Sequence, residues 1–268
     1  MSSSFRTIEL SDSEFESQGL RFLTVKTPNL KGRGDICLYV PKVDESIDNL
    51  PIYILLHGVY GSSWVWALKG GAHKTAKEMM ESKTIKPAII AMPSDGLWGD
   101  GSAYFSHHQK HFDNWIVDDV ITAVKENIPE AKNTASTCIG GLSMGGYGAL
   151  SLGARFPDKF KAISGHSSIT KLEQMSLFVE EPLAEDERTS KTLNVITILK
   201  ENKSKLPPFR FDCGTKDDLF FANKKLHQQL LEAKIAHEFE DLEGTHEWSY
   251  WIQNLKKTLS FFNKHSFK

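Results

Sequence analysis

A serine flanked by glycines gives this chain its clearest chemical signal. The run Gly141-Leu142-Ser143-Met144-Gly145-Gly146 follows a short, partly β-branched run at 136–140 and precedes helix-like sequence that stops at Pro157. A Gly-x-Ser-x-Gly pattern between a strand and a helix is typical of a nucleophile elbow, where small neighbours let the backbone double back and expose the hydroxyl. The pattern predicts acyl chemistry with Ser143 as nucleophile. The alternative is a glycine-rich turn whose serine caps the helix.

A serine nucleophile needs a base to take its proton and an acid to orient that base. In hydrolases with such an elbow, the acid and then a histidine follow later strands of the sheet. Asp217 follows a predicted strand that ends at Cys213, and His246 follows the last predicted strand. Asp218 is an alternative acid and Asp212 a poorer one, because it lies inside the strand. For His246 the alternative role is a cap on the final helix.

The loop His57-Gly58-Val59-Tyr60-Gly61-Ser62 follows an apolar, strand-like run at 52–56. Enzymes of this kind use that loop to donate one backbone N–H to the oxyanion of the tetrahedral intermediate. The residue after the nucleophile donates the other. We therefore expect the N–H groups of Val59 and Met144 to form the oxyanion hole. His57 is expected to order the loop, with direct proton transfer as its alternative role.

The loop at 92–104 is expected to line the substrate pocket, because ligands in open α/β sheets bind beyond the carboxyl ends of the strands. Its Trp98 and Tyr104 could stack on a ring, and Asp95 could bind hydroxyl groups. The alternative is an Ω-loop packed on its own Trp98. Further candidates for the pocket wall are His166, Trp64 and Trp66, for which core or surface packing is the alternative.

No metal or other cofactor is expected. His107, His108 and His111 lie close together, but no carboxylate or thiol completes a recognised zinc spacing. We interpret them as a solvated cluster. The three cysteines are odd in number and widely spaced within predicted strands, so free, buried thiols are expected and a catalytic cysteine is not; they are Cys37, Cys138 and Cys213.

The elements that must position these residues alternate between strand-like and helix-like runs. Strands are expected at 21–26 and 35–40 as an antiparallel pair, and at 52–56, 88–92, 136–140, 160–164, 209–213 and 238–242. Helices are expected at about 64–83, 112–128, 144–156, 219–234 and 246–262. This alternation predicts parallel βαβ units and therefore an α/β protein. We expect one domain over 1–268, with a helical insertion at about 168–205.

The net charge and the N-terminal sequence indicate which partners and which cellular compartment to expect. The chain has 268 residues and a formal net charge of -2, which offers no general attraction to nucleic acid or to an anionic membrane. The start, Met1-Ser2-Ser3-Ser4-Phe5-Arg6, lacks the apolar core of a signal peptide. A cytoplasmic protein with a small-molecule ester as its partner is therefore expected.

The motifs together resemble the esterase D-like branch of the α/β-hydrolases, which includes S-formylglutathione hydrolases, tributyrin esterases, feruloyl esterases and mycolyltransferases. The resemblance covers about 20–262, and its marks are Leu55-Leu56-His57-Gly58, the serine motif, Phe156-Pro157-Asp158-Lys159-Phe160, Cys213-Gly214-Thr215-Lys216-Asp217 and Gly244-Thr245-His246-Glu247-Trp248, with Trp251 beyond it. The resemblance implies an α/β-hydrolase fold, with a mostly parallel central sheet and helices on both faces. It also implies a carboxylic ester hydrolase that needs no metal, and a dimer or higher assembly. The acid of that group is the fifth residue of a Cys-Gly-x-x-Asp pattern, which favours Asp217 over Asp218.

The sequence thus predicts a serine carboxylesterase that hydrolyses a small or medium acyl ester through an acyl-enzyme on Ser143. Two other reactions use the same residues: hydrolysis of a thioester, as in S-formylglutathione hydrolases, and acyl transfer to a sugar or lipid. The lack of a secretion signal argues against the cell-wall transferases and extracellular feruloyl esterases of the group. A binding module that retains the hydrolase fold is the alternative outside enzymology.

Overall fold

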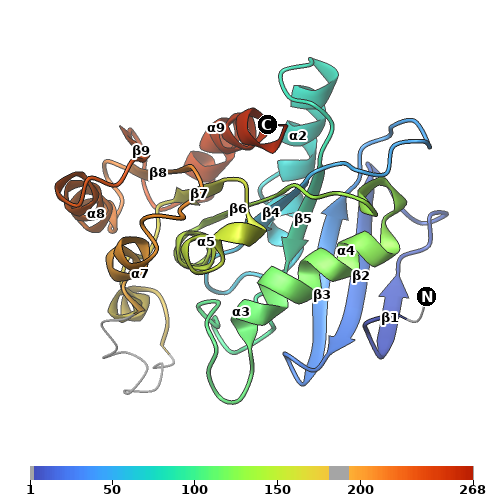
Figure 1. Cartoon of the computed structure of the whole chain (residues 1–268), viewed down its shortest axis with the longest axis horizontal. Helices are drawn as coiled ribbons and strands as arrows, with labels where there is room; N and C mark the ends of the chain where they lie inside the picture. The colour runs from blue at the N-terminus through green and yellow to red at the C-terminus, as the bar shows by residue number, and fades with distance from the viewer. Residues whose placement is uncertain (1–2, 181–192, 268) are drawn as a thin grey trace.

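A nine-stranded sheet runs through the computed structural model, which describes residues 3–180 and 193–267. Its order is β1-β2-β3-β5-β4-β6-β7-β8-β9 (Figure 1). In this order, the three pairings that join β1, β2, β3 and β5 are antiparallel. The five pairings that follow, from β5–β4 to β8–β9, are parallel. The strands are β1 Thr7–Leu10, β2 Leu20–Thr27, β3 Gly32–Tyr39, β4 Ile52–Leu56, β5 Ile89–Pro93, β6 Thr137–Leu142, β7 Ile163–His166, β8 Phe209–Gly214 and β9 Glu238–Leu242.

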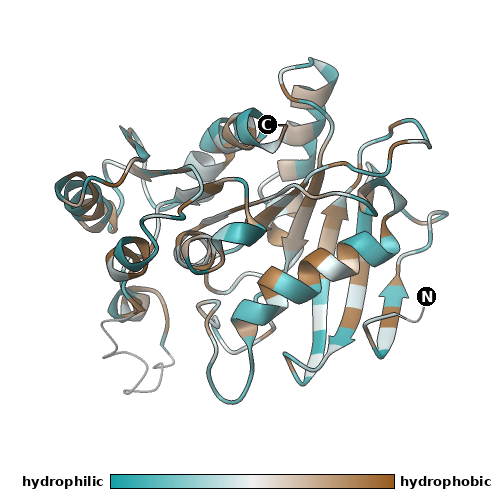
Figure 2. Cartoon of the chain, viewed as in Figure 1, coloured by the Kyte–Doolittle hydropathy of each residue, from teal (hydrophilic) through white to brown (hydrophobic). Residues whose placement is uncertain are grey.

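The two halves of the sheet follow different burial patterns. Every residue of β4, β5 and β6 is buried, as expected for parallel strands covered on both faces. β2 instead alternates between buried and more exposed positions, and Figure 2 shows the matching alternation of hydrophobic and hydrophilic residues. The prediction of a mostly parallel α/β sheet with an antiparallel N-terminal pair is confirmed. β1, which has no buried residue, was not predicted.

Helices cover both faces of the sheet, and each strand sends alternate side chains to the two layers. Ile54 and Leu56 of β4 join the apolar cluster under α3, α4, α5, α7 and α8, whereas Tyr53 and Leu55 join the cluster under α1, α2 and α9. Figure 1 shows α4 and α5 on one side and α2 and α9 on the other. The helices are α1 Val65–Leu68, α2 Ala72–Glu81, α3 Phe112–Asn114, α4 Ile121–Asn127, α5 Met144–Arg155, α7 Val195–Glu201, α8 Phe220–Glu232 and α9 Trp248–Ser266.

Three predicted elements differ in their details. The helix expected at 64–83 is broken into α1 and α2 at Gly71, whose φ of 64° is left-handed. Between α3 and α4 the chain forms a π-helical turn at Trp115–Val120, which 3.6-residue spacing does not reveal. β7 begins three residues and ends two residues later than predicted, so His166 belongs to the strand.

The segment predicted as a helical insertion holds a 3₁₀-helical stretch, Leu172–Leu177, and then α7. Residues 181–192 of that prediction lie outside the described part of the chain. Within the described ranges, no helix combines the length and the apolar character that a membrane crossing requires.

Candidate active site

Ser143 stands on a sharp turn between β6 and α5. Its φ and ψ are 53° and -117°, a conformation that side-chain-bearing residues rarely adopt. The flanking glycines permit it, because a Cβ at Gly141 would lie 2.3 Å from Gly145 O and a Cβ at Gly145 would lie 2.3 Å from Leu56 O. The Ser143 backbone N–H donates to His166 O at 2.9 Å, which ties the turn to β7. The chain therefore forms a sharp strand-to-helix turn at Ser143, as the spacing of the glycines around it predicted.

The structure brings Ser143, His246 and Asp217 together at the carboxyl ends of β6, β9 and β8. His246 Nε2 lies 3.0 Å from Ser143 Oγ, and His246 Nδ1 lies 2.9 Å from Asp217 Oδ2. Of the two adjacent aspartates, Asp217 is buried and Asp218 is exposed. Parallel strands end at one edge of a sheet, which explains how loops so distant in sequence meet.

The surroundings of Asp217 favour its ionised form. Burial alone raises the pKa of Asp217. The hydrogen bond and charge of His246, the Leu219 N–H and the Ser167 hydroxyl together lower it by more, so the net pKa lies below its usual value. The Leu219 N–H donates to Asp217 Oδ1 at 2.8 Å. The same carboxylate thus orients the imidazole and stabilises the turn that leads into α8.

Two aromatic side chains hold the His246 ring. Phe178 stacks on it with ring centroids 4.7 Å apart, and Trp251 packs edge-on at 5.1 Å. Phe178 was not predicted as a site residue, because it lies in a polar segment with no periodic signal. Trp251 was noted in the sequence only as a mark of the family resemblance.

The loop after β4 lies against the serine turn. A Cβ at Gly58 would lie 3.3 Å from Ser143 Cβ, and a Cβ at Gly101 would contact both Met144 Sδ and Val59 Cγ1, so these segments are closely packed. Met144 begins α5, so its N–H has no acceptor inside the helix. Among the backbone hydrogen bonds of the described loops, none uses the Val59 N–H as donor. Neither amide proposed for the oxyanion hole thus has a backbone acceptor among the described residues, and their role as oxyanion donors stays a prediction.

His57 is committed to ordering this loop. The side chain is buried, Nδ1 donates to Gly58 O at 2.6 Å, and Nε2 accepts from the Asp95 N–H at 3.0 Å. Both ring nitrogens are therefore occupied by backbone groups. This arrangement supports the structural role expected for His57.

A cavity of about 480 Å³ opens beside His246 and the serine turn. Its walls are largely aromatic, and a lysine and a glutamate lie among its polar groups. Side chains that line it include Tyr60, Trp64, Lys69, Phe178, Glu247 and Trp248. Trp64 and Trp66 were both candidates for the pocket wall. Trp64 lines this cavity, whereas Trp66 is buried and donates from Nε1 to Leu56 O at 2.9 Å.

The four residues predicted for the pocket do not line this cavity. Asp95 accepts the N–H groups of Leu97 and Ser102 within its own loop, and Tyr104 donates to His57 O at 3.0 Å. Trp98 stacks on His108 with centroids 4.9 Å apart. Asp95 thus bonds within the loop at 92–104, whereas Trp98 and Tyr104 contact residues outside it.

The fourth of these residues, His166, is buried inside the sheet layer. Its Nδ1 pairs with Asp212 Oδ2 at 2.9 Å, and its Nε2 lies 2.7 Å from Thr258 Oγ1. Asp212 also accepts from Tyr250 OH at 2.8 Å and pairs with Arg210 Nη1 at 2.8 Å. These groups form a buried polar network, and Asp212 is not the acid that contacts His246.

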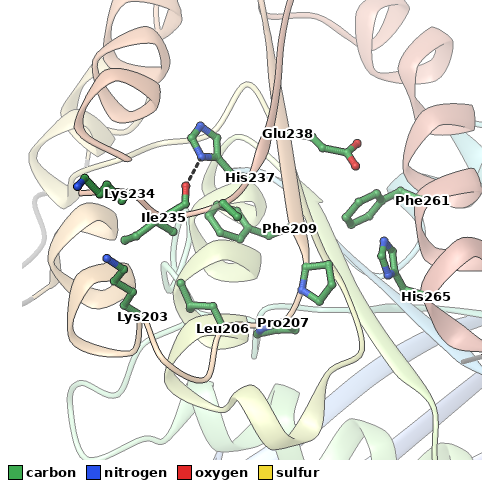
Figure 3. A pocket seen from close by; sticks show the side chains of 12 residues that line it. Lys203, Leu206, Pro207, Phe209, Lys234, Ile235, His237, Glu238, Phe261 and His265 are labelled. Carbon is green, nitrogen blue, oxygen red and sulfur yellow. Dashed lines mark hydrogen bonds between the residues drawn. The ribbon is translucent and has the colours of Figure 1, made fainter. Parts of the chain in front are cut away.

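Another cavity, of about 550 Å³, lies at the amino ends of β8 and β9, where Phe209 and Glu238 begin these strands (Figure 3). Several of its polar groups bond within the chain: Lys203 Nζ donates to Ala233 O at 2.8 Å, and His237 Nδ1 lies 2.8 Å from Ile235 O. It lies at the edge opposite to Ser143. We therefore place the candidate site at the smaller cavity.

Histidine and cysteine side chains are candidates for other kinds of site. In residues 3–180 and 193–267, no three His, Cys, Asp or Glu side chains are arranged to hold a metal ion. All three cysteines are free and buried in strands. Burial raises the pKa of Cys37 and of Cys138 to about 12 and raises that of Cys213 as well, which suppresses the thiolate.

Sequence comparison places the chain among esterases. The model of the family described as "Putative esterase" matches residues 27–262. An acetyl esterase from Caldicellulosiruptor saccharolyticus is 26% identical over 269 residues, covering 91% of this chain and 92% of that protein. An S-formylglutathione hydrolase from Arabidopsis thaliana is 27% identical over 151 residues, or 50% of this chain and 51% of that protein.

Solved structures share the fold. A ferulic acid esterase superposes with a TM-score of 0.79 at 22% identity, covering 97% of this chain and 99% of that one. An S-formylglutathione hydrolase from Staphylococcus aureus superposes with a TM-score of 0.77 at 17% identity, covering 95% of this chain and 99% of that one. Because the family model spans most of the sequence, the chain belongs to the "Putative esterase" family and is a serine esterase, a carboxylic ester hydrolase.

Proposed function

We propose that this protein hydrolyses a small or medium acyl ester through Ser143, His246 and Asp217. The observation that carries the proposal is the continuous hydrogen-bonded chain, with 3.0 Å between Ser143 Oγ and His246 Nε2 and 2.9 Å between His246 Nδ1 and Asp217 Oδ2. Such a chain converts a weakly nucleophilic hydroxyl into an attacking group.

The reaction would proceed in two steps. Ser143 Oγ attacks the ester carbonyl carbon while its proton moves to His246 Nε2, and the N–H groups of Val59 and Met144 stabilise the resulting oxyanion. Collapse of this intermediate breaks the bond to the leaving oxygen, which takes the proton from His246. A water molecule then attacks the acyl-enzyme with His246 as base, which releases the acid and restores the serine. Asp217 accepts the hydrogen bond from His246 Nδ1–H throughout, which orients the neutral ring and stabilises the imidazolium that forms when Nε2 takes a proton.

The cavity supports a modest substrate. A volume of about 480 Å³ lies in the range of small-molecule sites. Tyr60, Trp64 and Trp248 offer aromatic surfaces, while Lys69 and Glu247 offer polar groups at the same site. The similarity to an acetyl esterase over most of both chains supports a short acyl group. Similarity to an S-formylglutathione hydrolase over half of the chain keeps a thioester as the second candidate.

Three measurements test this function. A fluorophosphonate should label wild-type protein at Ser143, detected by mass spectrometry, and Ser143→Ala should abolish nitrophenyl acetate turnover while circular dichroism shows an intact fold. A matched panel of oxygen esters and thioesters then identifies the preferred leaving group. Absence of labelling in folded protein would instead favour a binding module, and transfer to an added alcohol in preference to water would favour an acyltransferase.

A further inference from the structure

The proposed reaction indicates which part of the cavity receives the alcohol part of the ester. His246 Nε2 gives its proton to the leaving oxygen, so the alcohol part has to lie beside this imidazole. Next to His246, the wall of the cavity continues along the chain through Glu247 and Trp248. These residues and the side chains packed on them are therefore placed to contact the alcohol part.

A lysine lies against this part of the wall. Lys69 Nζ is 5.8 Å from the centroid of the Trp248 ring, within the range of a cation–π contact. The Lys69 N–H donates to Val65 O at 3.1 Å, and a Cβ at Gly70 would lie only 2.6 Å from Trp248 Cζ3. The backbone that carries Lys69 is thus packed closely on Trp248, which keeps the ammonium group at this side of the cavity.

The Lys69 ammonium group carries a positive charge and three hydrogen-bond donors. Its side chain is exposed, and across residues 3–180 and 193–267 no carboxylate forms an ion pair with it. Among the described side chains that line the cavity, Lys69 and Glu247 carry the formal charges, apart from the imidazole of His246. An anionic group of a substrate could therefore pair with Lys69 without displacing a partner.

Carboxylates also lie around the cavity, at other positions. Glu247 immediately precedes α9, where the first N–H groups lack helical acceptors and the helix dipole partly balances a negative charge. The charges of Asp100 and Glu180 act on the hydroxyl of Tyr60, which belongs to the loop after β4. Lys69 is thus the charge at the Trp248 wall that has no such compensation.

We propose that Lys69 is a specificity-determining residue that favours esters with an anionic group in their alcohol part. The Trp248 ring contacts the apolar body of that part, and the ammonium group of Lys69 pairs with its negative charge. This proposal rests on the proposed function, because the proton transfer from His246 to the leaving oxygen is what places the alcohol part beside Trp248.

Three matched esters test the charge preference: meta-acetoxybenzoate, meta-acetoxybenzamide and meta-acetoxyphenyl-trimethylammonium. They share an acetyl group and a benzene ring, and they are negative, neutral and positive. After correction for the spontaneous hydrolysis of each ester, kcat/KM of the wild type should be about 3-fold higher for the benzoate than for the benzamide, the gain from an exposed ion pair. It should be lowest for the trimethylammonium ester.

Two further readouts identify the cause as an ion pair. The contact is remote from the reacting bonds and equally strong in the ground state and the transition state, so the preference should appear in KM and leave kcat equal. Because salt screens exposed charges, about 0.5 M NaCl should reduce the preference.

Three variants assign the preference to one side chain. Lys69→Met keeps the length of the side chain without its charge, and the benzoate and benzamide should then have equal kcat/KM. Lys69→Arg restores a cation and should restore the preference. Lys77→Met is the matched control, because Lys77 is exposed on α2 and is not among the cavity residues. It changes the net charge equally and should keep the wild-type preference.

The outcomes separate this proposal from the proposed function. A wild-type enzyme that does not prefer the benzoate, or that prefers the trimethylammonium ester, overturns the role of Lys69, as does a Lys69→Met enzyme that keeps the preference. In these cases Ser143→Ala should still be inactive on all three esters, so the proposed function stands. Hydrolysis of the esters by Ser143→Ala would instead disprove the proposed function and remove the basis of this proposal.

Discussion

Phe178 lies flat against His246, with ring centroids 4.7 Å apart and an angle of 22° between the planes. The contact joins the segment after β7 to the base of the proposed mechanism, and Phe178 also lines the cavity. One side chain thus limits both the motion of the imidazole and the space for substrate.

Phe178→Ala should lower kcat/KM for nitrophenyl acetate about 3- to 10-fold, because a stacked ring contact is worth about 0.5–1.5 kcal/mol. Initial-rate kinetics check this. Phe15→Ala is the control, since Phe15 is 81% exposed and is not among the cavity residues, and it should match wild type. Equal kinetics for both variants would show that the stack does not support catalysis.

Asp217→Asn should lower kcat by about four orders of magnitude, because an amide stabilises the wrong imidazole tautomer; the magnitude is that of the equivalent change in the serine protease triad. Asp218→Asn changes the exposed neighbour and should stay within about twofold of wild type. Both variants should keep the wild-type circular dichroism spectrum. Comparable losses in the two would mean that the acid has been assigned to the wrong residue.

Acid should destabilise the fold through Asp212. Burial alone raises the pKa of Asp212. The charge and hydrogen bond of His166, the charge of Arg210 and the Tyr250 hydroxyl together lower it by more, so the net pKa lies below its ordinary value. A carboxyl with a lowered folded-state pKa stabilises the protein above its unfolded pKa of about 3.9, and that contribution is lost as the pH falls through the folded-state value.

Asp212→Asn should therefore reduce the free energy of unfolding at pH 7 by about 3 kcal/mol, since it breaks the buried ion pair with Arg210 and leaves Glu240 as the remaining ion-pair partner of that guanidinium. Below about pH 4, its stability should fall less steeply with decreasing pH than that of wild type. Urea denaturation from pH 2.5 to 7 measures both effects, with Asp218→Asn as the control of equal charge change. Parallel curves for wild type and Asp212→Asn below pH 4 would contradict the assignment.

Gly145→Ala should destabilise the protein by about 3 kcal/mol or more and abolish activity, because its Cβ would lie 2.3 Å from the Leu56 carbonyl oxygen. Gly71→Ala is a matched control. At Gly71 a Cβ meets nothing within 4 Å, so only the left-handed φ of 64° is unfavourable, at about 1–2 kcal/mol. Thermal unfolding and nitrophenyl acetate turnover distinguish them; an active, stable Gly145→Ala enzyme would disprove the close-packing argument.

The sequence predicted the residues that stand at the ends of buried strands. β4, β5 and β6 are buried along their whole length because both faces are covered, so their largely apolar runs could be located in the sequence. The Gly-x-Ser-x-Gly pattern at the end of β6 then marked Ser143. The conformation of the loops was harder to predict from the sequence. Asp95 and Tyr104 have chemistry suited to a pocket, yet they bond to backbone groups of their own and neighbouring loops.

The remaining differences also have physical reasons. β1 is short and lacks buried residues, so no apolar pattern marks it. Phe178 contacts His246 through tertiary packing, and it belongs to no motif that spacing could reveal. Local propensity does not encode which distant ring a side chain will meet.

The aromatic walls of the cavity come from separate stretches of chain: Tyr60 and Trp64 from the loop after β4, Phe178 from the segment after β7, and Trp248 from the start of α9. The hydroxyl of Ser143 and the carboxylate of Asp217 are held by other turns. Replacing a wall side chain outside the proposed catalytic groups, such as Trp64, should thus change acyl preference while leaving the hydrogen bonds of Ser143, His246 and Asp217 intact, which makes this scaffold suited to modular redesign.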